Sequence, residues 1–228
     1  MNLEDSVCLD RLMPYLGLGE NRSAVRNALV EEFSCLEDLL CASRTHLAEC
    51  GVPESGVALL QAILPATRVA KREKYLRERP LCNTEERLGE IFCAFLRHMP
   101  EEHVAVALLD GEFRLLDLVD VSAGTRTSAP VVLRRLAEIA LKENAAFVAL
   151  AHNHPGGETE ASPEDYAATE AIKRCLDCLG SPLLEHFVVA EDRYLPILIG
   201  APSAPICGKI NPAAFYARST RQRAGLDY

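Results

Sequence analysis

Hydrophobic residues follow two different periods along this 228-residue chain. In its first part they recur every three or four positions, as in residues 24–33 and 36–40, which predicts amphipathic helices. Further on, a helical pattern at residues 84–96 precedes continuous apolar runs at residues 104–109 and 146–151, which are typical of buried strands. The pattern therefore predicts a small all-helical domain followed by a larger α/β domain with a mixed sheet.

Turn signals between the apolar segments define the rest of the α/β domain. Asp110-Gly111 predicts a hairpin turn after the strand at residues 104–109. Residues 130–143 carry apolar side chains at helical spacing. The predicted elements after this first strand are a strand at 115–121, the helix at 130–143, a strand at 147–151, and two final strands at 184–190 and 194–199 joined by a turn at 191–193.

Two proline-containing segments mark the predicted domain boundaries. Arg79 precedes Pro80, and the residue before a proline is pushed away from helical geometry. Residues 201–205 are rich in alanine and proline and resemble a linker. We therefore expect a helical domain at residues 1–79, an α/β domain at residues 80–200 and a basic C-terminal tail at residues 201–228.

Composition limits the classes of protein to be considered. No apolar run approaches the roughly 20 residues of a membrane span, and residues 1–5 lack the basic start of a signal peptide. The nine cysteines have no framework spacing, which fits reduced thiols better than disulfides. These features predict a cytoplasmic protein that does not interact with membranes.

The net charge of −9 is distributed unevenly. Residues 1–80 carry ten basic and twelve acidic side chains, residues 81–200 carry ten and twenty, and residues 201–228 carry four and one. The acidic α/β domain disfavours broad contact with a phosphate backbone. A solvated helix face is the simpler interpretation of the basic cluster at the expected end of the helical domain. That cluster consists of Arg68, Lys71, Arg72, Lys74, Arg77 and Arg79.

His152 and His154 are the strongest chemical signal in the chain, because they stand at the end of the apolar run at residues 146–151. Positions i and i+2 of a strand face the same side. Both imidazoles can therefore point at one ion while Asn153 points away. Pro155 and the two glycines after it stop the strand and allow a sharp turn.

A helix-start signature follows this turn. Ser162 is a capping residue, Pro163 takes the first helical position and Asp165 lies in the first turn. The turn should bring Asp165 back to His152 and His154, which gives two imidazole nitrogens and one carboxylate oxygen. Three protein ligands and a fourth position for water are typical of catalytic zinc. Two simpler interpretations stay open, namely a His-x-His pair without metal and an ordinary capping box.

The string His-x-His-Pro-x6-Ser-x2-Asp, from His152 to Asp165, resembles the JAMM (MPN+) metalloprotease motif. His-Asn-His-Pro-x-Gly together with Thr169 resembles the bacterial RadC-type branch of that family. The resemblance implies an α-β-α sandwich of the cytidine-deaminase-like kind, with Zn²⁺ held by His152, His154 and Asp165. It also implies hydrolysis of a peptide or isopeptide amide in a peptide or protein substrate.

The same resemblance implies roles for other residues of the site. In the JAMM family an acid at the start of an earlier strand is the general base, and the matching residue is Glu102, with Glu101 as its competitor. Glu102 would take a proton from zinc-activated water and pass it to the leaving nitrogen. Ser162 would stabilise the oxyanion. We expect a structural role for His186, and we expect His103 to face away from the side of Glu102.

Two departures from the RadC-type pattern lie beside the predicted metal ligands. Residues 131–135 stand where a Val-His-Pro-Arg-Glu-like stretch is usual, and only Arg134 is kept. Gly156 stands where serine is common. Neither change alters a predicted ligand, so we expect altered substrate contacts around Val132 and Leu133.

Residues 47–60 resemble a helix-hairpin-helix, the module that precedes the catalytic domain in RadC-type proteins. In that module a Gly-hydrophobic-Gly turn offers backbone N–H groups to a DNA phosphate. Here Pro53 replaces the second glycine and has no N–H to donate. The hairpin is therefore degenerate, and DNA is a weakly supported partner.

Three classes of function follow. A zinc-dependent metallohydrolase is the leading one. The alternative is a DNA-associated, DNA-repair-type protein that acts as a nuclease or a binding module. The third is a metal-free interaction scaffold, which is disfavoured because the candidate site is intact. The site consists of Glu102, His152, His154, Ser162 and Asp165.

Overall fold

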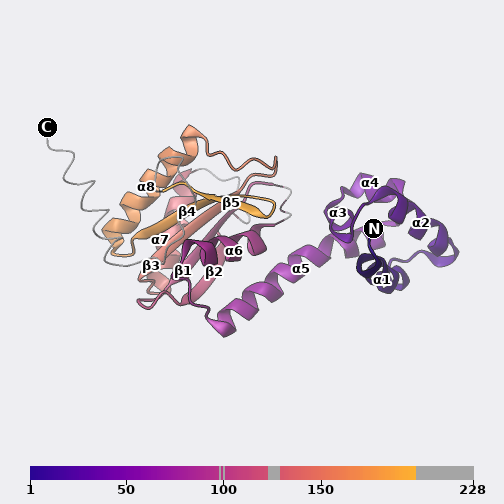
Figure 1. The fold of residues 1–228 in the computed structure, drawn as a ribbon, viewed down its shortest axis with the longest axis horizontal. Helices are drawn as coiled ribbons and strands as arrows, with labels where there is room; N and C mark the ends of the chain where they lie inside the picture. Colours follow the sequence, from indigo (N-terminus) through magenta and orange to yellow (C-terminus); the bar gives the residue numbers. More distant parts are fainter. Residues whose placement is uncertain (98, 100, 123–128, 199–228) are drawn as a thin grey trace. The chain divides into compact units, whose positions relative to one another are not determined.

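The computed structural model describes residues 1–97, 99, 101–122 and 129–198 (Figure 1). Two compact units divide the chain, Met1–Ala70 and Lys71–Tyr228. The division falls within helix α5, whereas the sequence places the boundary at Arg79, directly after this helix ends. The expected tail at residues 201–228 lies outside the described residues. Within the described ranges, no helix is both long enough and apolar enough to cross a membrane.

The first unit is helical, as the periodicity predicts. Its core is formed by fully buried leucines, with Leu9, Leu29 and Leu47 each 0% exposed. Ser43 caps its helix by accepting a hydrogen bond from the His46 N–H. The elements are α1 (Leu3–Leu12), the 3-10 turns η1 (Met13–Tyr15) and η2 (Gly19–Asn21), α2 (Arg22–Glu32), α3 (Leu36–Cys41), α4 (Arg44–Glu49) and the first part of α5 (Glu54–Glu78).

The turn between α4 and α5 is the hairpin that the sequence singles out. Gly51 has a φ of +87°, a conformation that glycine adopts without a steric penalty. Its N–H and that of Val52 donate to carbonyl oxygens of α4, those of Ala48 and Leu47. Pro53, which follows, carries no N–H. The donors of this turn are therefore used within the turn itself.

The second unit contains a mixed five-stranded sheet in the order β2-β1-β3-β4-β5. Within this sheet the β3–β4 pair is parallel, and it is connected by a helical crossover, as parallel strands require. The other three pairs are antiparallel. The strands are β1 (Val104–Leu109), β2 (Leu115–Asp120), β3 (Phe147–Asn153), β4 (Leu183–Ala190) and β5 (Arg193–Pro196).

Helices cover both faces of this sheet, as Figure 1 shows. On one face α6 (Glu85–Leu96) packs Phe92 against Phe187 of β4, with ring centroids 5.7 Å apart. On the other face α7 (Ala129–Lys142) and α8 (Pro163–Leu179) bury Leu136 and Leu176 against the strands. The alternating strand residues thus form two apolar layers, and the predicted α-β-α sandwich is confirmed.

The last strand differs from its predicted range. It begins at Arg193, directly after a turn in which Glu191 has a φ of +54°, and it ends at Pro196. The sequence predicts a strand at residues 194–199; residues 194–196 lie in β5, residues 197 and 198 lie beyond it, and residue 199 lies outside the described residues. Pro196, opposite Phe187, has no N–H to donate, but the Ile197 N–H still donates to the His186 carbonyl at 2.7 Å, so one bond to β4 follows the end of the strand.

The basic cluster at residues 68–79 makes ion pairs within the second unit. The Arg72 guanidinium donates from Nη2 to both carboxylate oxygens of Asp117 at 2.6 and 2.8 Å and from Nε to the Leu118 carbonyl at 2.9 Å. Arg79 Nη2 donates to Asp110 at 2.8 Å. These contacts hold the end of α5 to β2 and to the hairpin after β1. Arg72 and Arg79 therefore have structural partners.

Candidate metal centre

The two histidines of the candidate site lie at the end of strand β3. His152 lies within the strand and is 2% exposed, while His154 follows it and continues the ladder by donating its N–H to the Val189 carbonyl at 2.8 Å. Since alternate strand residues share a face, both rings lie on one side of the sheet. Asn153 projects to the opposite side, as the sequence predicts, and bonds there to the backbone of Glu101.

The turn after β3 is fixed by several hydrogen bonds. The Gly157 N–H donates to the His154 carbonyl at 3.1 Å, and Gly157 has a φ of +83°. Arg193 of β5 donates to the Gly157 carbonyl at 2.7 Å. His154 Nδ1 lies 3.0 Å from the Glu158 carbonyl oxygen, which can only accept, so Nδ1 carries the proton. The lone pair of His154 therefore belongs to Nε2.

The start of α8 delivers the carboxylate. Ser162 and Asp165 form a reciprocal capping box, in which the Asp165 N–H donates to Ser162 Oγ and the Ser162 N–H donates to Asp165 Oδ2. The Ser162 hydroxyl also donates to Oδ2 at 2.7 Å. Oδ2 thus has two donors from Ser162, and Oδ1 is the carboxylate oxygen nearer to His152. The predicted capping box is therefore present, and it also orients the Asp165 carboxylate.

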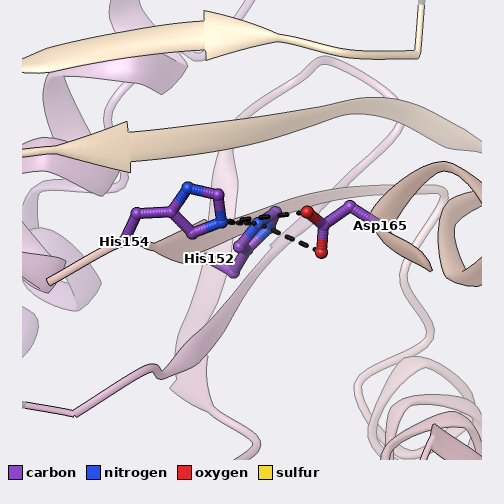
Figure 2. Close-up of side chains that lie close together, drawn as sticks. All are labelled: His152, His154 and Asp165. Atoms are coloured by element: carbon purple, nitrogen blue, oxygen red, sulfur yellow. Dashed lines mark hydrogen bonds and ion pairs between the residues drawn. The ribbon is translucent and has the colours of Figure 1, made fainter. Parts of the chain in front are cut away.

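The three candidate ligands converge at one point (Figure 2). His152 Nε2 lies 3.1 Å from His154 Nε2 and 3.4 Å from Asp165 Oδ1, and His154 Nε2 lies 3.8 Å from Asp165 Oδ2. A tetrahedral zinc ion with bonds of about 2.0–2.1 Å separates its ligand atoms by about 3.3–3.5 Å. The observed separations of 3.1, 3.4 and 3.8 Å lie on both sides of this range, and two imidazole nitrogens with a carboxylate are donors that zinc binds.

Burial and neighbouring polar groups set the protonation of His152 and Asp165. Burial lowers the pKa of His152 to about 4, so the ring is neutral at neutral pH and able to act as a ligand. Burial acts to raise the pKa of Asp165, but hydrogen bonds from Ser162 and the adjacent histidine rings outweigh it and hold that pKa below its usual value. Both groups are thus in the protonation state that metal binding requires.

Two further polar side chains adjoin the ligands from within the core. His186 of β4 is 5% exposed, and its Nε2 lies 2.9 Å from His152 Nδ1. Its Nδ1 lies 2.6 Å from the hydroxyl of Thr169 in α8. Burial lowers the pKa of His186 to about 3, so this ring is neutral. The sequence assigns His186 only a structural role, although a histidine within the apolar run of β4 is a signal of a buried polar contact.

Glu102 lies two residues before the start of β1 and is exposed. The register of β1 and β3 pairs Val104 with His152, and the Asn153 N–H donates to the His103 carbonyl at 3.2 Å. Continued by two residues beyond Val104, this register would set Glu102 opposite His154, on the face that carries the ligands. His103 turns to the other face, where its Nδ1 contacts Asp120 at 2.8 Å.

The side chains of Val132 and Leu133, around which altered substrate contacts are expected, pack in the core. Val132 is 8% exposed and belongs to the apolar layer beneath α7, and Leu133 packs against the same layer. Apolar side chains at helical spacing face the core, and altered substrate contacts in this segment stay a prediction. Arg134 is the exposed member of this stretch, and its Nε donates to Glu138 at 2.8 Å.

An α-β-α sandwich with two imidazoles at a strand end and a carboxylate at the next helix start defines a class of metal-binding α/β domains. Within that class, the chain belongs to the RadC-like JAB domain family, whose model matches residues 82–197. This is a family of the JAMM metallohydrolase type, its members are generally hydrolytic, and JAB domains commonly bind zinc.

Curated relatives are similar over most of their length. A UPF0758 protein of Marinomonas sp. (strain MWYL1) is 37% identical over 164 residues, which cover 72% of this chain and 73% of that protein. A UPF0758 protein of Idiomarina loihiensis is 33% identical over 189 residues, or 82% of this chain and 84% of the relative. A UPF0758 protein of Bordetella bronchiseptica is 34% identical over 176 residues, which cover 75% of this chain and 76% of that protein.

Proposed function

We propose that this protein is a zinc-dependent metallohydrolase that cleaves a peptide or isopeptide amide. The observation that carries the proposal is the convergence of His152, His154 and Asp165, whose ligand atoms all lie within 4.8 Å of one another. Donor type and protonation both suit zinc. Family membership supports the hydrolytic class.

The residues that would hold zinc are His152 and His154 through Nε2 and Asp165 through its carboxylate. Zinc held there would lower the pKa of a bound water to about 7 and polarise a substrate carbonyl. Three protein ligands leave a fourth tetrahedral position for water or substrate, which distinguishes catalytic from structural zinc.

Glu102 is the residue that we assign as general base. Its carboxylate is exposed, and the β1–β3 register, continued two residues beyond Val104, would set it on the ligand face opposite His154. From there it takes the proton of the attacking water and delivers it to the leaving amide nitrogen. Glu101, the neighbouring acid, would face the opposite side if the alternation of β1 continued to it, so we assign the role to Glu102.

Ser162 is assigned to the oxyanion. In the structure its hydroxyl hydrogen points to Asp165 Oδ2 at 2.7 Å, so this donor must turn to reach a substrate oxygen. The backbone N–H of Ser162 also donates to Oδ2, so the carboxylate keeps one donor when the hydroxyl turns away. A donor of this kind contributes on the order of 3 kcal/mol to transition-state stabilisation.

The alternative of a DNA-associated protein is supported less well. The basic residues Arg72 and Arg79 are engaged by Asp117 and Asp110. The hairpin before α5 has its Gly51 and Val52 donors in use and a proline at the next position. A peptide or protein substrate is therefore the partner that we propose.

The experiment is hydrolysis of a library of peptides and isopeptide-linked conjugates by the zinc-loaded full-length protein. We expect cleavage by the wild type, loss of at least about 100-fold in Glu102→Gln with zinc still bound, and near-normal cleavage by the matched variant Glu101→Gln. Equal activity of Glu102→Gln and wild type would refute the assignment of the base. Absence of cleavage by a zinc-loaded wild type across both substrate kinds would contradict the proposed reaction.

A further inference from the structure

A chain of three hydrogen bonds connects two of the candidate ligands through the core. The Thr169 hydroxyl donates to the backbone carbonyl of Asp165 at 2.6 Å. The same hydroxyl oxygen lies 2.6 Å from His186 Nδ1, and His186 Nε2 lies 2.9 Å from His152 Nδ1. The three side chains are buried, with Thr169, His186 and His152 at 2%, 5% and 2% exposure. Water therefore does not supply alternative partners.

The direction of this chain follows from counting protons. A carbonyl oxygen only accepts, so the single hydroxyl hydrogen of Thr169 is used by Asp165. The Thr169 oxygen can then only accept from His186, whose Nδ1 must carry the hydrogen. A neutral imidazole has one N–H, so Nε2 of His186 is an acceptor. It takes the hydrogen of His152 Nδ1, and the lone pair of His152 is left on Nε2.

We propose that Thr169 and His186 are positioning residues that hold His152 in the Nδ1–H tautomer, so that its Nε2 lone pair is directed at the metal position. The proposal rests on the metal site of the proposed function. It assigns a purpose to a buried histidine that lies behind the candidate ligands. The opposite direction would place a hydrogen on His152 Nε2, facing His154 Nε2 at 3.1 Å, and His152 could not then act as a ligand.

These hydrogen bonds connect two candidate ligands, because they begin at the ring of His152 and end at the backbone carbonyl of Asp165. His152 comes from β3, His186 from β4, and Thr169 and Asp165 from α8. The hydrogen bonds thereby fix the position of the end of β3 relative to the start of α8. Partners of this kind orient the ring of a ligating histidine and raise its basicity, and their removal typically weakens metal binding about 10–100-fold.

The first test reads the tautomer in the metal-free, full-length protein. Long-range ¹H–¹⁵N correlation spectra of histidine-labelled protein report which ring nitrogen carries the hydrogen, and a His152→Asn variant assigns the signal. We expect the Nδ1–H pattern for His152 in the wild type and its loss in Thr169→Val. An Nε2–H pattern for His152 in the wild type would overturn the proposal.

The second test measures zinc affinity by competition with a chelator. We expect Thr169→Val to weaken zinc binding at least about tenfold and Thr169→Ser, which keeps the hydroxyl, to restore it. Ser181→Ala is the matched control, because Ser181 also donates a buried hydroxyl to a backbone carbonyl, that of Ala145 at 2.6 Å, without contacting a ligand. Equal zinc affinity of Thr169→Val and the wild type would contradict the positioning role.

The two tests separate this proposal from the proposed function. An Nδ1–H tautomer in a protein that binds no zinc would support the hydrogen-bond chain and refute the metallohydrolase. Tight zinc binding with an Nε2–H tautomer would refute the chain and leave the metal site intact. Hydrolytic activity is not needed for either readout.

Discussion

The side chain of Asn153 holds the backbone on both sides of Glu102. Asn153 Oδ1 accepts the His103 N–H at 2.8 Å, and Nδ2 donates to the Glu101 carbonyl at 3.0 Å. Asn153, the last residue of β3, stands between His152 and His154 in sequence, with its side chain on the opposite face. The strand that carries the ligands therefore also fixes the segment that carries the assigned base.

Replacing Asn153 by aspartate should separate catalysis from metal binding. The introduced carboxylate would still accept the His103 N–H, but the donor to the Glu101 carbonyl would be lost, and the two oxygens would repel each other. Because small misplacements of a catalytic group cost up to about 100-fold, we expect kcat to fall about 10–100-fold with zinc content unchanged. Parallel measurement of turnover and bound zinc checks this. Unchanged kcat in Asn153→Asp would show that Asn153 does not position Glu102.

Glu185 predicts an unusual pH dependence of stability. Its side chain is 1% exposed, and burial raises its pKa to about 8. The folded state therefore binds one more proton than the unfolded state between the ordinary value of 4.5 and about pH 8. Stability falls as pH rises through this window, by up to about 1.4 kcal/mol per pH unit. Urea unfolding at a series of pH values measures that slope.

The Glu185→Gln variant tests the same residue directly. Glutamine keeps an oxygen that can accept the N–H groups of His186 and Leu198, which now bond to Glu185 Oε1. We expect the variant to lose most of the slope and to be more stable than the wild type at pH 8. Glu170→Gln, an exposed acid on α8, is the control that should leave the slope in place. An equal slope in Glu185→Gln would exclude Glu185 as its source.

Arg72 should be needed for stability. Its ion pair with both carboxylate oxygens of Asp117 and its hydrogen bond to the Leu118 carbonyl are partly buried. Arg72→Ala leaves that carboxylate without its cation, so we expect the free energy of unfolding to fall by about 2 kcal/mol. Lys74→Ala should change it by less than about 0.5 kcal/mol, because Lys74 meets Glu78 only at 3.9 Å and is largely exposed.

The same pair of variants addresses the DNA alternative. If Arg72 serves the fold, duplex DNA binding at physiological salt should be weak in the wild type and insensitive to Lys74→Ala. Tight, salt-dependent binding that is lost in Lys74→Ala would instead point to a phosphate contact by this helix.

Local pattern was sufficient to predict most of the fold and the candidate ligands. The run before His152 and the capping signature at Ser162 each depend on neighbours in sequence, so their elements could be predicted from short windows. The limits of the strand at Arg193–Pro196 depend on pairing with β4, which a short window of sequence does not contain. A departure from a family motif, as at Val132, gives no indication of which side of a helix faces the core.

The partners of the ligands could not be predicted in this way. His186 reaches His152 across 34 positions of sequence, and Asn153 reaches Glu101 across 52. Such contacts arise only when the sheet sets β3 beside β4 and β1. In the sequence, such contacts are indicated only by a polar residue within an apolar strand run. That residue indicates a buried polar contact, but it does not identify the partner.

Metal analysis of the purified wild-type protein beside Asp165→Ala is the most direct test of the central claim. From a zinc-replete preparation we predict about one zinc ion per chain in the wild type and little in Asp165→Ala, because three protein ligands are needed to hold the ion. Glu164→Ala, one residue earlier in the same helix turn, is the control that should keep its zinc. A folded wild-type protein without zinc, or equal zinc in wild type and Asp165→Ala, would contradict the account.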